Sequence, residues 1–345
     1  MELKIEKEKE NVWKQAFFLC SKGGDGLSYQ IIITHNQTHY IPTVLDGIEW
    51  NTERTGSPGK LTFSTIGKEV AFEEGDAVQF YVDETPVFFG FLFTQKHTED
   101  EEISWTAYDQ LRYLQYKDTI LYRDLTATEL IRLIARTAEL QVGSLADTGM
   151  KIARRLEDNT SYFEMIQNAL DETLTVRGRN YVLYDNFGKL ELADLESMLL
   201  DILLDAETGE SYEYTSSIDT NTYNRIKLAY DNEDSGMRDI YIAQDSSNIN
   251  RWGVLQYFES LPSPNGAQAK ADALLSFYNR KTKNLSLSGM AGDARVRAGT
   301  SVAVLLTLGD GTKLQNYMLV EKARHRFRES EHTMDLTLRG GDFVV

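Results

Sequence analysis

Two histidines, His35 and His39, stand four residues apart, the spacing that places two metal ligands on one face of a helix. The apolar run Ile31–Ile33 directly before them favours a strand instead, and no acidic third ligand accompanies the pair. We therefore interpret both as surface histidines beside a turn, and the pair predicts no metal site.

An acidic stretch that begins at Asp231 resembles the start of a calcium loop. Oxygen-bearing side chains stand at alternate positions and Gly236 is in sixth place. The twelfth position is Ile242, where a calcium loop needs a bidentate glutamate. A β-turn between strands that end near Tyr230 and restart near Asp239 explains the stretch better.

No group of residues in the sequence matches a catalytic constellation. The glycine-rich stretches at 23–26 and 340–341 lack the strand-to-helix context of phosphate-binding loops. There is no Gly-x-Ser-x-Gly elbow, and Cys20, the single cysteine, lies in an N-terminal tail without a histidine and acid to activate it. We therefore expect no enzymatic activity, no catalytic residues, no cofactor and no bound metal.

Composition limits the partners of the chain. Its 345 residues, 41% of them hydrophobic, allow two or three domains with sizeable cores. A net charge of −17 disfavours sequence-independent nucleic-acid binding, although DNA could pass along such a surface as cargo without adhering. The charged N-terminus lacks a signal-peptide core and no stretch is apolar enough to insert into a membrane, so we expect a soluble protein made without export.

One small β unit occurs twice, 224 residues apart, so that Leu61 meets Leu285 and Gly75 meets Gly299. Each copy reads as a strand, a turn region and a strand that follows a glycine, with apolar side chains at every second position. The similarity continues from 91–96 to 317–322 at an offset of 226, which a longer later turn would explain. Any two amphipathic hairpins can be superposed, but continuity across an insertion placed in a turn favours a true duplication.

Charged residues near the end of each copy indicate a possible interface. Four cations alternate along a predicted strand, and so point to one side of it: Lys322, Arg324, Arg326 and Arg328. The turn that follows Lys96 in the first copy is acidic instead, with Glu99, Asp100, Glu101 and Glu102. Either both are solvated surfaces, or first and second copies alternate around a ring and these charges steer neighbours into register.

Several short sequence blocks, spread from about residue 25 to the C-terminus, together are characteristic of one protein family. Among them are 48–50, 57–63, 72–76, 88–91, 106–114, 185–190, 252–257 and 278–281. In these blocks the chain resembles the XkdQ/YqbQ family of hub proteins from the contractile tails of PBSX-type prophages. The resemblance implies a structural protein of the virion tail baseplate, assembled in the cytoplasm of the bacterial host.

The resemblance also implies an assembly. Three copies would form a ring, each with two tube-like domains, so that the ring has quasi-sixfold symmetry. It would join a hexameric tail tube to a trimeric spike. The expected partners are the chain itself as a homotrimer, the tail tube protein, the spike protein and other baseplate proteins. A tail-associated cell-wall hydrolase and a receptor-binding tail module are the alternatives, and a phage and a headless bacteriocin remain equally open as the source.

The periodicity and the resemblance together predict an α+β, mainly β fold: two tube-like antiparallel β-barrel or sandwich domains in one chain, with a small helical insert and additional β-hairpins. Capping boxes at Thr126 and Ser161 begin the two helices of the insert. The predicted segments are an N-terminal arm (1–27), the first tube-like domain (28–115), the helical insert (116–176), a hairpin region that partly completes the first tube-like domain (177–262), and a helix with the second tube-like domain (263–345).

Overall fold

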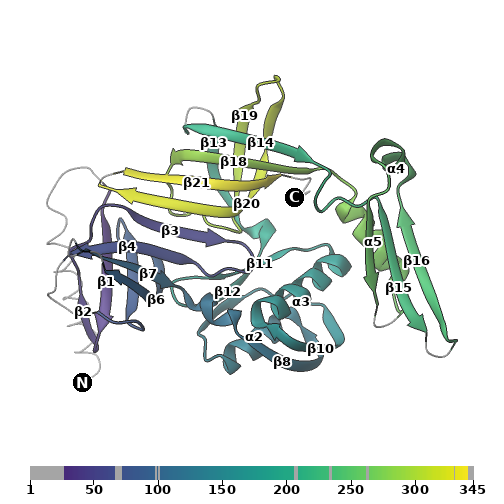
Figure 1. Cartoon of the computed structure of the whole chain (residues 1–345), viewed down its shortest axis with the longest axis horizontal. Coiled ribbons are helices and arrows are strands. Elements are labelled where there is room, and N and C mark those ends of the chain that lie inside the picture. Colours follow the sequence, from purple (N-terminus) through teal and green to yellow (C-terminus); the bar gives the residue numbers. More distant parts are fainter. Residues whose placement is uncertain are drawn as a thin grey trace.

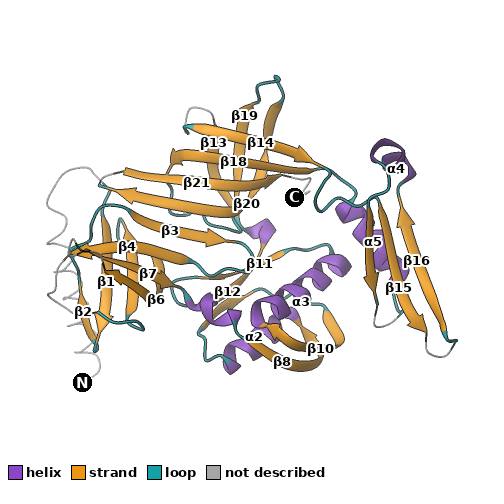
Figure 2. Cartoon of the chain, viewed as in Figure 1, coloured by secondary structure: helices purple, strands orange, loops and turns teal. Residues whose placement is uncertain are grey.

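The fold is mainly β with few helices, which confirms that part of the prediction (Figures 1 and 2). A computed structural model describes the chain, and the residues it describes are 27–66, 72–97, 99, 102–205, 209–232, 235–261, 264–329 and 331–340. The predicted N-terminal arm, with Cys20, lies almost wholly outside these residues.

The first β unit contains seven strands of alternating buried and exposed residues: β1 (Tyr29–His35), β2 (Thr38–Tyr40), β3 (Ile48–Glu53), β4 (Lys60–Ile66), β5 (Ala77–Val82), β6 (Thr85–His97) and β7 (Glu102–Tyr108). Every second side chain points inward because successive residues of a strand face opposite sides. The inward residues form one apolar core that includes Trp50, Phe63, Phe80 and Trp105.

The second β unit contains six strands: β13 (Leu199–Asp205), β14 (Ser211–Ser217), β18 (Thr282–Ala291), β19 (Ser301–Thr307), β20 (Lys313–Arg328) and β21 (Glu331–Gly340). Its core is aliphatic rather than aromatic and is built from residues such as Leu285, Val302, Val320 and Leu336. Each unit therefore has a hydrophobic core of its own.

Both units belong to one 13-stranded sheet, whose main path runs β14-β18-β21-β20-β3-β4-β7-β6-β5-β1-β2 (Figure 1). Neither unit closes into a barrel within the described strands, so the expectation of closed barrels is wrong, while the division into two tube-like domains stays a prediction. The cause of the open arrangement is the length of β20: its first half pairs with β19, whereas its second half pairs with β3 of the other unit.

The insert between the units combines helices with short strands: η1 (Gln110–Gln115), β8 (Lys117–Thr126), α2 (Ala127–Thr137), β9 (Val142–Leu145), β10 (Lys151–Ser161), α3 (Tyr162–Arg177), β11 (Tyr181–Asp185), β12 (Leu190–Asp194) and η2 (Leu195–Ser197). Complete capping boxes begin α2 at Thr126 and α3 at Ser161, as the sequence predicts. The hairpin β11–β12 shares its core with these two helices.

A small unit projects from the rest of the chain on the right of Figure 1. It contains β15 (Arg225–Asn232), β16 (Met237–Gln244), α4 (Ser246–Trp252), β17 (Gln256–Ser260) and α5 (Ala267–Tyr278). Helix α5 packs against one face of the three-stranded sheet β16-β15-β17. The segment 177–262 is thus distributed over the insert, the second β unit and this small unit.

The described part of the chain contains neither a helix that could span a membrane nor a cluster of metal ligands. None of its helices is long and apolar enough to cross a membrane. It also contains no group of three or more histidine, cysteine or acidic residues placed to hold a metal ion.

Candidate assembly interface

Three strands of each β unit are paired in the same register as their counterparts in the other unit. In the first unit Leu61 of β4 lies opposite Ala107 of β7, and Ala107 lies opposite Leu92 of β6. In the second unit Leu285 of β18 lies opposite Leu338 of β21, which lies opposite Val320 of β20. Each ladder then has a bulge directly after Leu92 or Val320. The duplication therefore extends to individual backbone pairs, bulge included.

The glycines Gly75 and Gly299 occupy equivalent positions in these units. Their φ angles are +100° and +95°, a left-handed conformation that glycine adopts without steric cost. The Gly75 N–H donates to the Leu92 carbonyl at 2.8 Å, and the Gly299 N–H donates to the Val320 carbonyl at 2.9 Å. These bonds set the offset between β6 and β20 at 228 residues, so the offset of 226 inferred from the sequence is wrong by two positions.

The two units meet where the second half of β20 pairs with β3 in antiparallel orientation, with His325 opposite Trp50. The two rings stack with centroids 5.0 Å apart. On the solvent side of the same ladder, Arg324 Nη2 contacts the Glu49 carboxylate at 2.5 Å. The junction thus combines backbone pairing, an aromatic stack and an ion pair.

Two buried histidines lie beneath this junction. His325 Nε2 is 2.8 Å from the Val296 carbonyl, and His325 Nδ1 is 2.8 Å from His332 Nε2. Because a carbonyl can only accept, His325 donates through Nε2, and its Nδ1 then accepts the N–H of His332. Burial lowers the pKa of His325 to about 3 and that of His332 to about 4, so both rings are neutral in the folded chain.

The charged residues singled out from the sequence lie in two places. The four cations of β20 alternate with buried Ala323, His325 and Phe327 and so share the solvent side of the strand. Three of them contact carboxylates within the chain: Lys322 with Glu53, Arg324 with Glu49, and Arg326 with Asp335. Glu99 lies in a turn after β6 and Glu102 is the first residue of β7, whereas Asp100 and Glu101 lie outside the described residues. Their role in steering neighbours stays a prediction.

A buried charged cluster that the sequence did not reveal ties three parts of the chain together. The Arg297 guanidinium lies 4.0 Å from the centroid of the Tyr184 ring and donates to the Asp185 carbonyl at 2.9 Å. Asp109 accepts from the backbone N–H of Gly59 at 2.9 Å. Burial raises the pKa of Asp185 to about 6, and burial together with the nearby Asp185 carboxylate raises the pKa of Asp109 above its usual range. The cluster joins the first unit, the β11–β12 hairpin and the second unit.

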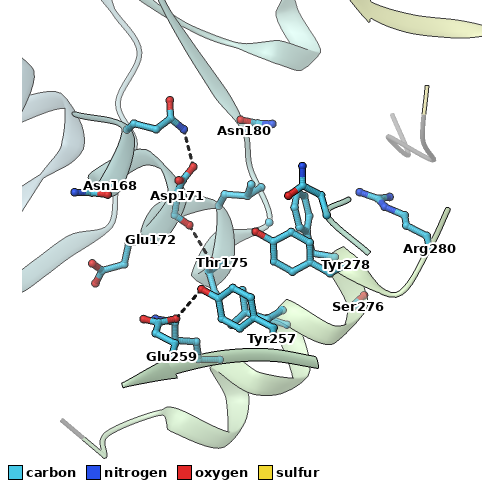
Figure 3. Close-up of a pocket in the computed structure, with 18 of the residues that line it drawn as sticks. Asn168, Asp171, Glu172, Thr175, Asn180, Tyr257, Glu259, Ser276, Tyr278 and Arg280 are labelled. Atoms are coloured by element: carbon cyan, nitrogen blue, oxygen red, sulfur yellow. Dashed lines mark hydrogen bonds and ion pairs between the residues drawn. The ribbon is translucent and has the colours of Figure 1, made fainter. Parts of the chain in front are cut away.

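A cleft of about 720 Å³ lies between α3 and α5 (Figure 3). Its polar side chains bind one another: Tyr257 donates to the Glu259 carboxylate at 3.1 Å, and Gln167 donates to Asp171 at 2.6 Å. Lys270 also pairs with Glu259 at 2.6 Å. We interpret the cleft as the polar seam along which the small unit packs against the insert.

The fold is that of phage tail proteins. The structure resembles the crystal structure of the 43 kDa tail protein of prophage MuSo2 from Shewanella oneidensis with a TM-score of 0.67 and 14% identity, covering 90% of this chain and 98% of that chain. It also resembles the E. coli c3393 protein, a type VI secretion component described as structurally similar to the T4 tail proteins gp27 and gp5. That TM-score is 0.56 at 12% identity, over 89% of this chain and 76% of that chain.

The chain belongs to the YqbQ-like family, whose sequence model matches residues 48–339. It is 29% identical over 315 residues to the protein YqbQ of Bacillus subtilis strain 168, which covers 87% of this chain and 93% of that protein. The phage-like element PBSX protein XkdQ of the same strain is 28% identical over 313 residues, with the same coverage of both chains. The chain is thus a YqbQ-like protein related to a protein of the PBSX phage-like element, and it shares its fold with phage tail proteins.

Proposed function

We propose that the chain is the hub of a contractile tail baseplate, in a phage or a phage-tail-like bacteriocin, and that it assembles as a trimer with quasi-sixfold symmetry. The observation that carries this proposal is the match between the two β units, which share strand pairing, bulge and glycine turn. Three chains with two such units each present six similar units to a neighbour.

A hub of this kind reconciles two symmetries. The six β units would match the subunits of a hexameric tail tube, while the three chains would match a trimeric spike. The likeness to the c3393 protein, itself similar to the T4 tail proteins gp27 and gp5, supports a place beside such a spike. The net charge of −17 would let DNA pass through the ring without adhering.

Native mass spectrometry of the purified full-length chain, alone and with the tail tube protein of the same element, tests the proposal. We expect an assembly of three chains of 39.3 kDa each, alone or once the tube protein is added. A stable dimer, or a ring of six chains, would overturn the hub assignment, as would a chain that stays monomeric with the tube protein present. Robust release of fragments from purified peptidoglycan would favour the hydrolase alternative instead.

A further inference from the structure

The internal junction, in which β20 pairs with β3, can be compared with the equivalent segments elsewhere in the chain. Within the chain, the half of β20 that lies beyond β19 pairs with β3. If the units are equivalent, the matching half of β6 should pair with the strand that matches β3. The register on both sides identifies these two segments.

The strand that matches β3 is β14. Trp50 of β3 lies opposite Leu61, and Tyr214 of β14 lies opposite Leu285. Since Leu61 and Leu285 are equivalent, Tyr214 stands in the place of Trp50. With the offset of 228 along β6 and β20, His97 stands in the place of His325.

Both matching segments are open edges of the sheet. β14 ends the strand order and pairs only with β18 among the described strands. The outer half of β6, from Thr94 to His97, pairs with β7 on one side, because β5 reaches only as far as Phe91. Exposed backbone edges of this length are templates for pairing with another strand.

The residues at the internal junction are more buried than their counterparts at the open edges, as expected if the open edges lack a partner strand. His325 and Trp50 are 0% and 4% exposed at the junction within the chain. Their counterparts differ: the His97 side chain is exposed and Tyr214 is only half-buried. Equivalent positions are thus covered in one junction and uncovered at the open edges.

The side chains at the open edges repeat the chemistry of the internal junction. Arg324 pairs with Glu49 inside the chain, and the equivalent residues are Lys96 and Glu213, again a cation and a carboxylate. Neither has an ion-pair partner within the described part of the chain. The positions of Trp50 and His325, whose rings stack at the internal junction, correspond to Tyr214 and His97, again an aromatic residue and a histidine.

We propose that β6 of one copy pairs antiparallel with β14 of the next copy, with His97 opposite Tyr214 and Lys96 opposite Thr215. Lys96 then reaches Glu213 across the ladder, as Arg324 reaches Glu49. The inference rests on the proposed ring of chains and adds the surface that closes it. Because one edge of each copy binds the other edge of its neighbour, the contact is head-to-tail, and internal and external junctions alternate around the ring.

A disulfide across the proposed ladder tests the register. In a Cys20→Ser background, the full chain carries Lys96→Cys together with Thr215→Cys, whose Cα atoms would lie about 4.5 to 5.5 Å apart. The matched control joins Lys96→Cys with Ser211→Cys, displaced by four residues or about 13 Å along β14. After mild oxidation, we expect covalent oligomers on non-reducing gels from the first pair and at least tenfold less from the control.

Charge reversal provides an independent measurement on the full chain. Lys96→Glu should raise the concentration needed for half-assembly roughly tenfold, and adding Glu213→Lys should restore assembly. A trimer that forms without the disulfide and is insensitive to both charge variants would refute this interface and leave the proposed hub function standing. A chain that never assembles, even with the tube protein, would refute the hub function and this interface together.

Discussion

Acid should weaken the junction between the two β units through its buried histidines. His325 and His332 are both neutral in the folded chain, with pKa values lowered to about 3 and about 4 by burial. An unfolded histidine titrates near pH 6.5. The unfolded chain therefore binds more protons between these values, and the free energy of unfolding falls as the pH drops below about 6.5.

The size of the effect follows from the pKa shifts. At pH 5 an unfolded histidine is almost fully protonated while the folded one is not, which costs about 2 kcal/mol per histidine relative to pH 7. Asp185 works in the opposite direction, because its folded pKa of about 6 makes the folded chain bind a proton in this range. The histidine contribution must therefore be isolated by comparison with a variant.

His332→Gln is the informative variant because its amide can still donate to His325 Nδ1. Urea unfolding at pH 7 and pH 5, followed by tryptophan fluorescence, gives the loss of stability in each protein. We expect the loss in the variant to be smaller than in the wild type by about 2 kcal/mol. His39→Gln, on exposed β2, controls for removal of one histidine. Equal losses in the wild type and His332→Gln would refute the reasoning.

Three further changes test how the parts of the chain are held. Gly299→Ala should destabilise by about 3 kcal/mol in urea unfolding, because φ is +95° and the new methyl would lie 2.7 Å from a valine methyl of β11. Gly75→Ala, at φ +100° in open space, should cost only about 1 kcal/mol, and equal losses would contradict this account. Arg297→Met should cost about 3 to 5 kcal/mol because it leaves Asp185 without its cation, and an added Asp185→Asn should recover part of the loss. Thr126→Ala should cost about 1 kcal/mol by removing the α2 cap, measured by thermal unfolding; an unchanged Tm would show that the cap contributes nothing.

Local patterns predicted the elements that depend on neighbouring residues. The capping boxes at Thr126 and Ser161 were recognisable because each places a glutamate three residues after a hydroxyl. Asp231 and Asn232, which begin the acidic stretch, are the last residues of β15 and pair antiparallel with β16, as expected for two strands of a hairpin. Helix α5 carries no such capping signal, since its N-cap is Gly266 and no side chain caps it.

The duplication could be recognised in the sequence because both copies keep the turns and the alternation of apolar residues. The alignment of β6 with β20, in the later part of the repeat, could not be recognised correctly. The sequence placed Phe91 with Tyr317, whereas the strand pairing places Phe91 with Leu319. Alternating apolar residues look alike after a shift of two positions, since the period of a strand is two. The strand pairing and the hydrogen bonds of Gly75 and Gly299 together distinguish the two alignments.

Contacts between distant segments could not be predicted from local pattern. The pairing of β20 with β3 joins residues about 275 positions apart, and no periodicity records such a partnership. The same holds for Arg297 with Asp109 and Asp185, although both aspartates lie in blocks that carry the family resemblance. One weak signal in the sequence marks Arg297, a cation that stands between the apolar residues Val296 and Ala298, and both of these are buried in the structure.

The most direct test of the hub assignment is a cryo-electron microscopy reconstruction of the assembled tail tip, computed without imposed symmetry. We predict a ring of three chains in which six β units alternate, first unit beside second unit, with Gly75 and Gly299 at matching positions around the axis. A ring of six chains, or three chains whose second units lie away from the ring, would contradict it.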